Sequence, residues 1–139
     1  MSLSFSTYTS VALLVYPRPV PSNGRIKTVG VQIYSDAGLT NILSSIDWGF
    51  VEPGATLTHS CYILNTGNFP CILSMTVTDW IPSAASAYIT LTWNREATTL
   101  PEGVGHSIEA ILTLTVRSDV TGIDTFAFTA TIVGTAVNT

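Results

Sequence analysis

Histidine and cysteine perform much of the acid–base, nucleophilic and metal chemistry of proteins near neutral pH, and this chain has two of each. His59 is followed by Ser60, but neighbouring residues of a β-strand point to opposite faces, so the two cannot act as a nucleophile and its base. The alternation of its segment places His59 on the inward face, which indicates a hydrogen-bonded core residue. His106 follows a glycine-rich loop and is expected to be exposed.

The acidic residues lie mostly at predicted strand ends and turns, where aspartate usually caps its own backbone. The sequence contains no paired-cysteine zinc spacing, no calcium loop of the EF-hand kind and no phosphate-binding glycine loop. It also lacks the glycine-serine-glycine elbow of serine hydrolases. We therefore expect no catalytic residues, no metal, no cofactor and no enzymatic activity.

The two cysteines flank Asn65-Thr66-Gly67, a pattern that is common in three-residue hairpin loops. Such a hairpin would place Ile63 opposite Phe69 and Cys61 opposite Cys71. Opposed residues lie roughly 4.5–5.5 Å apart at Cα, which a disulfide can span. We therefore predict a Cys61–Cys71 disulfide in an oxidising compartment. The alternative is two buried free thiols, and it follows directly if the protein is cytosolic.

Three aromatic residues are candidates for a stacking surface that could bind a sugar: Tyr34, Trp48 and Trp80. Carbohydrate binding would require these side chains to be exposed. The alternative interpretation for the tryptophans is core packing at the ends of strands, which the sequence favours.

The charge of the chain excludes two classes of partner. The net charge is −4, and only 10% of the residues are charged. Nucleic acids and anionic membrane surfaces both select proteins with a basic face, which five lysines and arginines cannot build here. No apolar stretch approaches the roughly 20 residues that a membrane span needs. A surface this poor in charge offers little repulsion against association, so we expect a homo-oligomer or polymer.

The hydropathy pattern has a period of two almost throughout, which predicts β-strands. Alternation is found at 29–34, 57–63, 71–78, 89–94, 108–117 and 125–132. Turn-forming residues separate these segments, and 82–87 is the one plausible helical turn. Together with an N-terminal strand, this predicts an all-β protein, an immunoglobulin-like antiparallel β-sandwich of about seven strands.

The N-terminal segment 11–16 differs from the others because it is apolar on both faces. Its members are Val11, Ala12, Leu13, Leu14, Val15 and Tyr16. A proline-rich linker follows, with Pro17, Pro19 and Pro21, and is expected to be stiff and extended. We therefore divide the chain into residues 1–23, a candidate donor strand with its linker, and residues 24–139, the sandwich. A strand that is apolar on both faces must be covered on both faces.

Several short motifs resemble immunoglobulin-like modules of archaeal secreted and cell-surface proteins, of the kind known as CARDB-like adhesion-related domains. They are Ile46-Asp47-Trp48-Gly49, Glu52-Pro53-Gly54, the hairpin segment 62–68, Asp79-Trp80 and the segment 89–93. The resemblance covers residues 24–134. It implies a stalk, adhesion unit or appendage located outside the cell or on its surface, with no catalytic residues. Leu64 departs from the pattern, because this position is usually polar and faces outward.

Two functions follow as hypotheses. In the first, the protein is an extracellular structural protein, a subunit of a filament assembled by strand donation. The assembly strand, Val11, Leu13, Leu14, Val15 and Tyr16, would complete the sandwich of a neighbouring copy. A competing interpretation makes the same segment the first strand of its own sandwich. In the second function, the protein is a carbohydrate- or partner-binding adhesion module that does not self-assemble.

Overall fold

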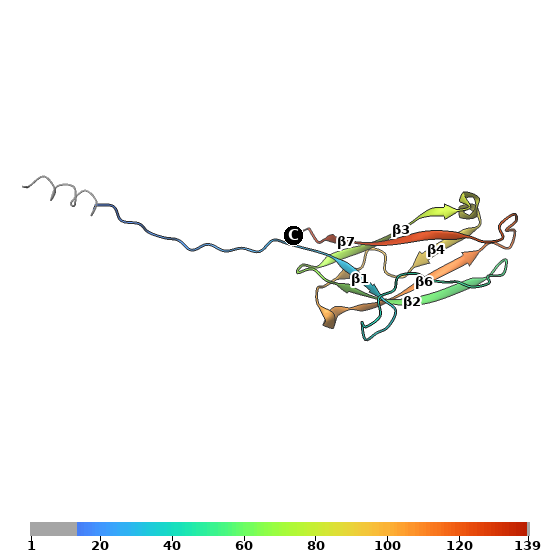
Figure 1. Ribbon diagram of the computed structural model, residues 1–139, viewed down its shortest axis with the longest axis horizontal. Helices are drawn as coiled ribbons and strands as arrows, with labels where there is room; N and C mark the ends of the chain where they lie inside the picture. The colour runs from blue at the N-terminus through green and yellow to red at the C-terminus, as the bar shows by residue number, and fades with distance from the viewer. Residues whose placement is uncertain (1–13, 139) are drawn as a thin grey trace, which may run out of the picture.

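The computed structural model describes residues 14–138 and has two antiparallel sheets packed into a sandwich (Figure 1). One sheet has the order β1-β2-β6-β4, formed by Val31–Tyr34, Thr56–Asn65, Ile108–Val116 and Ile89–Trp93. The other has the order β5-β3-β7, formed by Thr99–Leu100, Cys71–Ile81 and Ala127–Ala136. Two short 3-10 helices, η1 at Ser83–Ala87 and η2 at Val104–His106, complete the elements. The predicted all-β sandwich is confirmed.

The core lies between the two sheets and is built by the alternation that the sequence displays. In β6, Ala110, Leu112, Leu114 and Val116 are buried, whereas the residues between them are more exposed. The inward residues of β2 and β3, including Ile63 and Leu73, complete this cluster from both layers. Burial of one face only is what a period of two produces in an antiparallel sheet.

Six of the predicted strands are present within one to four residues of their expected bounds, and the predicted helical turn at 82–87 is η1. The seventh predicted strand, at 11–16, is described only in its last three residues. Its described part, Leu14–Tyr16, contains no strand residue, and Val11 and Leu13 lie outside the described residues. Among the described residues, the two-residue β5 is the seventh strand instead.

The predicted hairpin at Asn65-Thr66-Gly67 is wrong. β2 pairs with β1 and β6, whereas β3 pairs with β5 and β7, so the two strands lie in opposite sheets. Cys61 is paired with Ala110, and Cys71 with Leu100 and Ala136. The register that suggested a disulfide does not exist, and both cysteines are buried free thiols.

Asn65 gives the physical reason for this crossing. Its buried amide group donates hydrogen bonds to the carbonyls of Phe69 (2.8 Å) and Leu100 (3.1 Å), and its carbonyl accepts one from the Gly67 N–H (2.9 Å). The loop also pairs with the chain before β1, since the Thr66 N–H donates to the Gly30 carbonyl over 2.9 Å. These bonds turn the chain out of one sheet and into the other.

Candidate functional site

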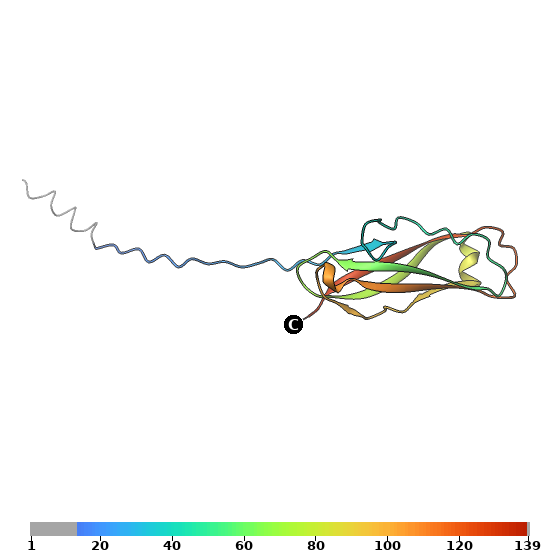
Figure 2. The same cartoon turned by 90° about the horizontal axis from the view of Figure 1, so that it is seen from below.

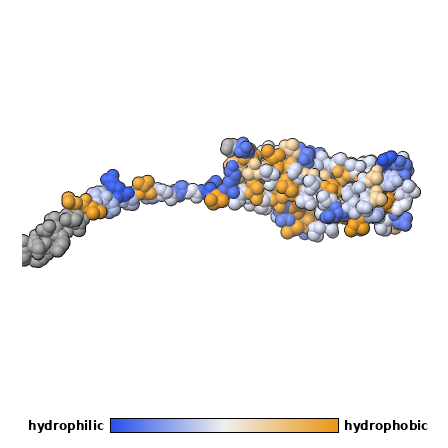
Figure 3. Space-filling model, turned by 90° about the horizontal axis from the view of Figure 1, so that it is seen from above, coloured by the Kyte–Doolittle hydropathy of each residue, from blue (hydrophilic) through white to orange (hydrophobic). Residues whose placement is uncertain are grey.

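The described part of the N-terminal segment lies in solvent. Residues 14–28 run away from the end of the sandwich as an extended chain, close to where the C-terminus lies (Figures 1 and 2). Leu14, Val15 and Tyr16 are 82%, 73% and 77% exposed. The predicted assembly strand therefore has no cover from its own sandwich over these residues. Apolar side chains are visible along this tail in Figure 3 and also gather in patches on the sandwich itself.

The tail is fixed to the sandwich at its base. The Thr28 N–H donates to the side-chain carbonyl of Asn68 over 2.9 Å, and the Asn68 amide group donates to the Ile26 carbonyl over 3.1 Å. Beyond Ile26 the three prolines stiffen the chain, because each proline ring fixes its backbone φ. The tail is thus held at one end and projects from the sandwich.

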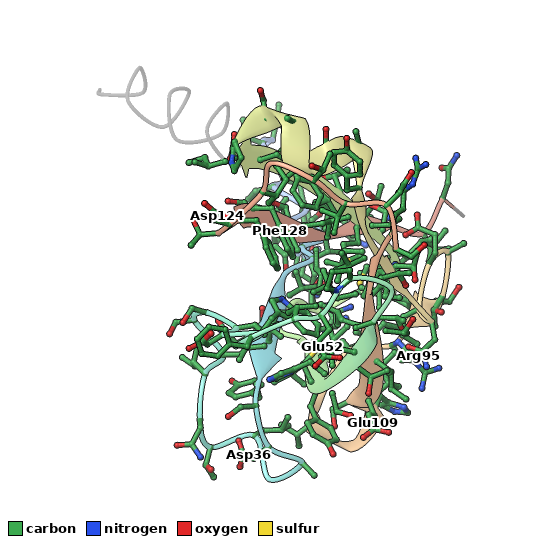
Figure 4. All side chains as sticks on the ribbon, turned by 90° about the vertical axis from the view of Figure 1, so that its right-hand side faces the viewer. Asp36, Glu52, Arg95, Glu109, Asp124 and Phe128 are labelled. Atoms are coloured by element: carbon green, nitrogen blue, oxygen red, sulfur yellow. The ribbon has the colours of Figure 1, made fainter. Side chains whose placement is uncertain are left out.

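The sandwich itself is open along one side. β1 has four residues and β7 has ten, so β1 covers only part of the length of β7. After β1, residues 35–55 form loops apart from the bridge of Tyr34 to Ile42. Looking along the sandwich, Figure 4 places Phe128 on one side of the opening and the loop region that carries Asp36 and Glu52 on the other.

This opening is a cavity of about 420 Å³ between the sheets. Its walls are the first half of β7 with the residue before it, the loop segment 43–48, and core residues beneath them. The apolar lining residues include Leu43, Ile46, Trp48, Cys61, Leu91, Leu112, Phe126, Phe128, Ala130 and Ile132. Asp47 is the single charged residue of the lining. We call this cavity the β7 groove.

The strand β7 also has an unpaired edge among the described residues, because β3 is its only partner there. The pairing of β3 fixes which backbone groups point to this edge. The Leu73 N–H donates to the Thr98 carbonyl, and the Leu73 carbonyl accepts from Ala97, so both groups of Leu73 point away from β7. Leu73 and Gly134 are therefore a non-hydrogen-bonded pair.

The alternation of an antiparallel ladder extends this result along β7. Met75–Ile132 and Val77–Ala130 have the same parity as Leu73–Gly134, so they are also non-hydrogen-bonded pairs. The N–H and C=O groups of Ala130 and Ile132 therefore point to the open edge. Both residues also line the β7 groove. The open edge thus combines free backbone groups with an apolar lining at the same residues.

Cys61 forms part of the groove lining and is fully buried. Burial raises the pKa of its thiol to about 11, and the negative charge of Glu109 adds to this effect. Burial also raises the pKa of Cys71. Both thiols are therefore protonated near neutral pH and have little nucleophilic character, because the thiolate is the reactive form.

The three aromatic candidates do not form one exposed surface. Tyr34, Trp48 and Trp80 are all half-buried. Trp48 lines the groove, and the ring of Trp80 packs at 4.7 Å from that of Phe128. Leu64, expected at an outward position, is buried at 8% exposure, so its own chain covers it.

The two histidines lie where the sequence predicted, one exposed and one on an inward face, but an expected hydrogen bond is missing. His106 is exposed in η2, whereas His59 is half-buried with its ring 6.0 Å from the Trp48 ring in an edge-on contact. The expected hydrogen bond to His59 is missing at Nδ1, which is buried without a partner. Neither histidine belongs to a group of three or more potential metal ligands anywhere in 14–138.

No helix within the described part of the chain is long and apolar enough to cross a membrane. No protein-family model matches the sequence, and no curated protein matches it either. The resemblance to CARDB-like modules therefore stays a prediction. Sequence reasoning identified the tail and the inward residues of the last strand, but it missed the groove. The groove depends on how much of the length of β7 is covered by β1, and no local sequence pattern indicates that length.

Proposed function

We propose that this protein is an extracellular structural protein, the subunit of a filament or surface appendage in which neighbouring copies donate a β-strand. One observation carries the proposal: the described end of the apolar segment, Leu14–Tyr16, lies uncovered in solvent, while the described sandwich has a largely apolar groove beside the open edge of β7. Each of these features is unfavourable alone, because exposed apolar side chains and open strand edges both promote association. Together they are complementary.

The geometry of such an exchange leads to a polymer. A copy that donates its tail to one neighbour still has a vacant groove, which accepts the tail of another copy. This head-to-tail contact is heterologous, and it continues into a filament unless the rotation between copies closes it into a ring. The low charge supports association between copies, and the resemblance of the motifs to archaeal cell-surface modules is the ground for the extracellular location.

Removal of residues 1–20 tests the proposal. We expect the full chain to form long polymers that are visible by negative-stain electron microscopy, and the shortened chain to remain monomeric in sedimentation. Polymers that persist after the deletion, or a full chain that stays monomeric at high concentration, would contradict strand donation.

A point variant with a matched control sharpens this test. Leu14→Asp places a charge within the assembly strand, where burial would cost several kcal/mol, so polymers should be lost. Val20 is similarly exposed at 81% but lies in the linker, outside the strand. Val20→Asp should therefore leave polymers intact, and equal losses in the two variants would indicate an unspecific effect of charge on the tail.

A second function has one specific observation in its favour. At about 420 Å³ the β7 groove lies within the range of roughly 300–1,000 Å³ that is usual for small-molecule sites. Trp48 and Phe128 could stack against a sugar, with Asp47 as an acceptor. In this case the protein is a carbohydrate-binding adhesion module without self-assembly. Glycan binding by a monomeric full chain, lost in Trp48→Ala, would favour this function over the first.

A further inference from the structure

We propose that the acceptor for the donated strand is the β7 groove, and that residues 11–16 of a second copy extend the β5-β3-β7 sheet by pairing with the open edge of β7. This inference rests on the proposed function and specifies its site. The occupant is a second copy of this chain, and the contact combines a backbone ladder with the burial of alternate apolar side chains.

The backbone of β7 provides the first argument. The edge-directed N–H and C=O groups belong to Ala130 and Ile132, whose side chains line the groove. Residues directly opposite each other in a sheet place their side chains on the same face. A strand that bonds to Ala130 and Ile132 therefore directs the side chains of its bonded residues into the groove. Backbone pairing and filling of the cavity occur in the same register.

The composition of the donor provides the second argument. The groove accepts every second side chain of an added strand, and its lining is mainly apolar, with Ser44, Ser45, Asp47 and Thr129 as its polar residues. In the donor segment both alternate sets are apolar, so either set can fill the groove without burying a charge. The first charged residue of the donor, Arg18, is positive and lies beyond the strand, which complements the negative Asp47.

The linker explains why the donor belongs to another copy. Residues 17–28 are extended and rich in proline, and at about 3.1 Å per residue they span roughly 35–40 Å. The ten residues of β7 span a similar distance, roughly 34 Å at about 3.4 Å per residue. The tail leaves the sandwich beside the C-terminus and points away from it (Figure 1), so Leu14–Tyr16 lie about one sandwich length beyond the end of their own sandwich and farther still from their own groove.

Proline at position 130 tests the backbone ladder. Ala130→Pro removes an N–H that points to the open edge and makes no bond to β3, so the sandwich should fold as before. The ring also blocks the approach of a partner strand. Thr131→Val is the control, because Thr131 is the next residue of β7, is exposed outside the lining of the groove, and keeps its backbone N–H as valine. We expect Thr131→Val to polymerise as the unmodified chain does, and Ala130→Pro to require a roughly tenfold higher concentration or more.

The outcomes separate this inference from the proposed function. If the unmodified chain forms no polymers, the proposed function fails and the acceptor site fails with it. If the unmodified chain polymerises and the proline and valine variants do so equally, strand donation stands and the β7 groove is overturned as its acceptor. Thermal unfolding of both variants establishes that they are folded.

A cross-linking measurement gives an answer even if the proline variant does not fold. A photoreactive benzophenone amino acid in place of Leu14, in an equal mixture of ¹⁴N- and ¹⁵N-labelled full chains, should form cross-links to residues 126–132 or 43–48. Hybrid isotope pairs should be present among them. Cross-links confined to other surfaces would overturn the inference, as would pairs that arise only within one chain.

Discussion

Asn65 is the buried polar residue on which the connection between the two sheets depends. It is 1% exposed at the end of β2, and it satisfies two carbonyls and one N–H of the following chain. A buried polar group that loses its hydrogen-bond partner costs about 1–3 kcal/mol. An apolar side chain at position 65 would leave two carbonyls and one N–H without their partner.

We therefore predict that Asn65→Ala lowers the free energy of unfolding by about 3 kcal/mol in urea denaturation. The control is Asn41→Ala, since the Asn41 side chain is exposed and donates only to Thr40. That variant should change stability by less than about 0.5 kcal/mol. Similar losses in both variants would show that the connection does not depend on the Asn65 amide.

Burial in the fold lowers the reactivity of the Cys61 thiol. A pKa of about 11 in place of the ordinary 9.0 leaves roughly a hundredfold less thiolate at pH 8. We predict that iodoacetamide alkylates Cys61 in folded Cys71→Ser about a hundredfold more slowly than in the same variant unfolded in urea. Equal rates would contradict the burial of Cys61. In the unmodified chain, loss of both free thiols on air oxidation would instead revive the predicted disulfide.

The same shift makes stability depend on pH in the alkaline range. The unfolded thiol ionises near pH 9, whereas the folded one remains protonated up to about pH 11, so the unfolded state binds fewer protons between these values. The free energy of unfolding should therefore fall as the pH rises from about 9 to about 11. Cys61→Ser should reduce this slope, as measured by urea denaturation at several pH values.

At the scale of elements, the segment before β1 is held in place by close contact with the loop after β2. A Cβ at Gly67 would lie only 2.5 Å from the Val29 Cα, closer than real Cβ atoms approach, and it would also overlap the Thr28 carbonyl. Any side chain at this position must therefore push the segment at 28–29 away. Because this segment is the base of the tail, Gly67 links the direction of the tail to the sandwich.

We predict that Gly67→Ala lowers the free energy of unfolding by about 1–3 kcal/mol, as overpacking does elsewhere. It should also raise the rate of hydrogen exchange at the N–H groups of Thr28 and Thr66, which bond across this contact. Gly105→Ala is the control, since a Cβ at position 105 would have no neighbour within 4 Å in the described part of the chain. Unchanged exchange in Gly67→Ala would mean that the segment adapts without cost.

At the scale of the whole molecule, few charges are available to hold copies together. Only 10% of the residues are charged, and the one ion pair among the described residues, Arg117–Asp119, is at the surface. Assembly by backbone bonds and apolar burial is insensitive to salt, because screening acts on charges.

Polymers of the full chain should therefore persist when NaCl is raised from about 0.1 M to about 1 M, which shortens the screening length from roughly 10 Å to 3 Å. Sedimentation of the polymer fraction at each concentration measures this. Dissolution at high salt would point to ion pairs between copies, and it would argue against strand donation as the main contact.

The sequence alone was enough to predict most of the β-strands and their inward faces. The alternating residues of β6, such as Leu112 and Leu114, are buried as expected, because the direction of a side chain along a strand depends only on local geometry. It also singled out the apolar tail and its stiff linker, since both are properties of consecutive residues.

The distribution of the strands between the two sheets follows from tertiary contacts. The loop at 65–68 has the residues of a hairpin, yet Asn65 bonds to Leu100 and turns the chain into the other layer. The groove beside β7 could not be predicted from the sequence either, because it arises where β1 ends before covering Ala130 and Phe128. Strand partners are set by contacts between residues far apart in the chain, and local alternation contains no information about them.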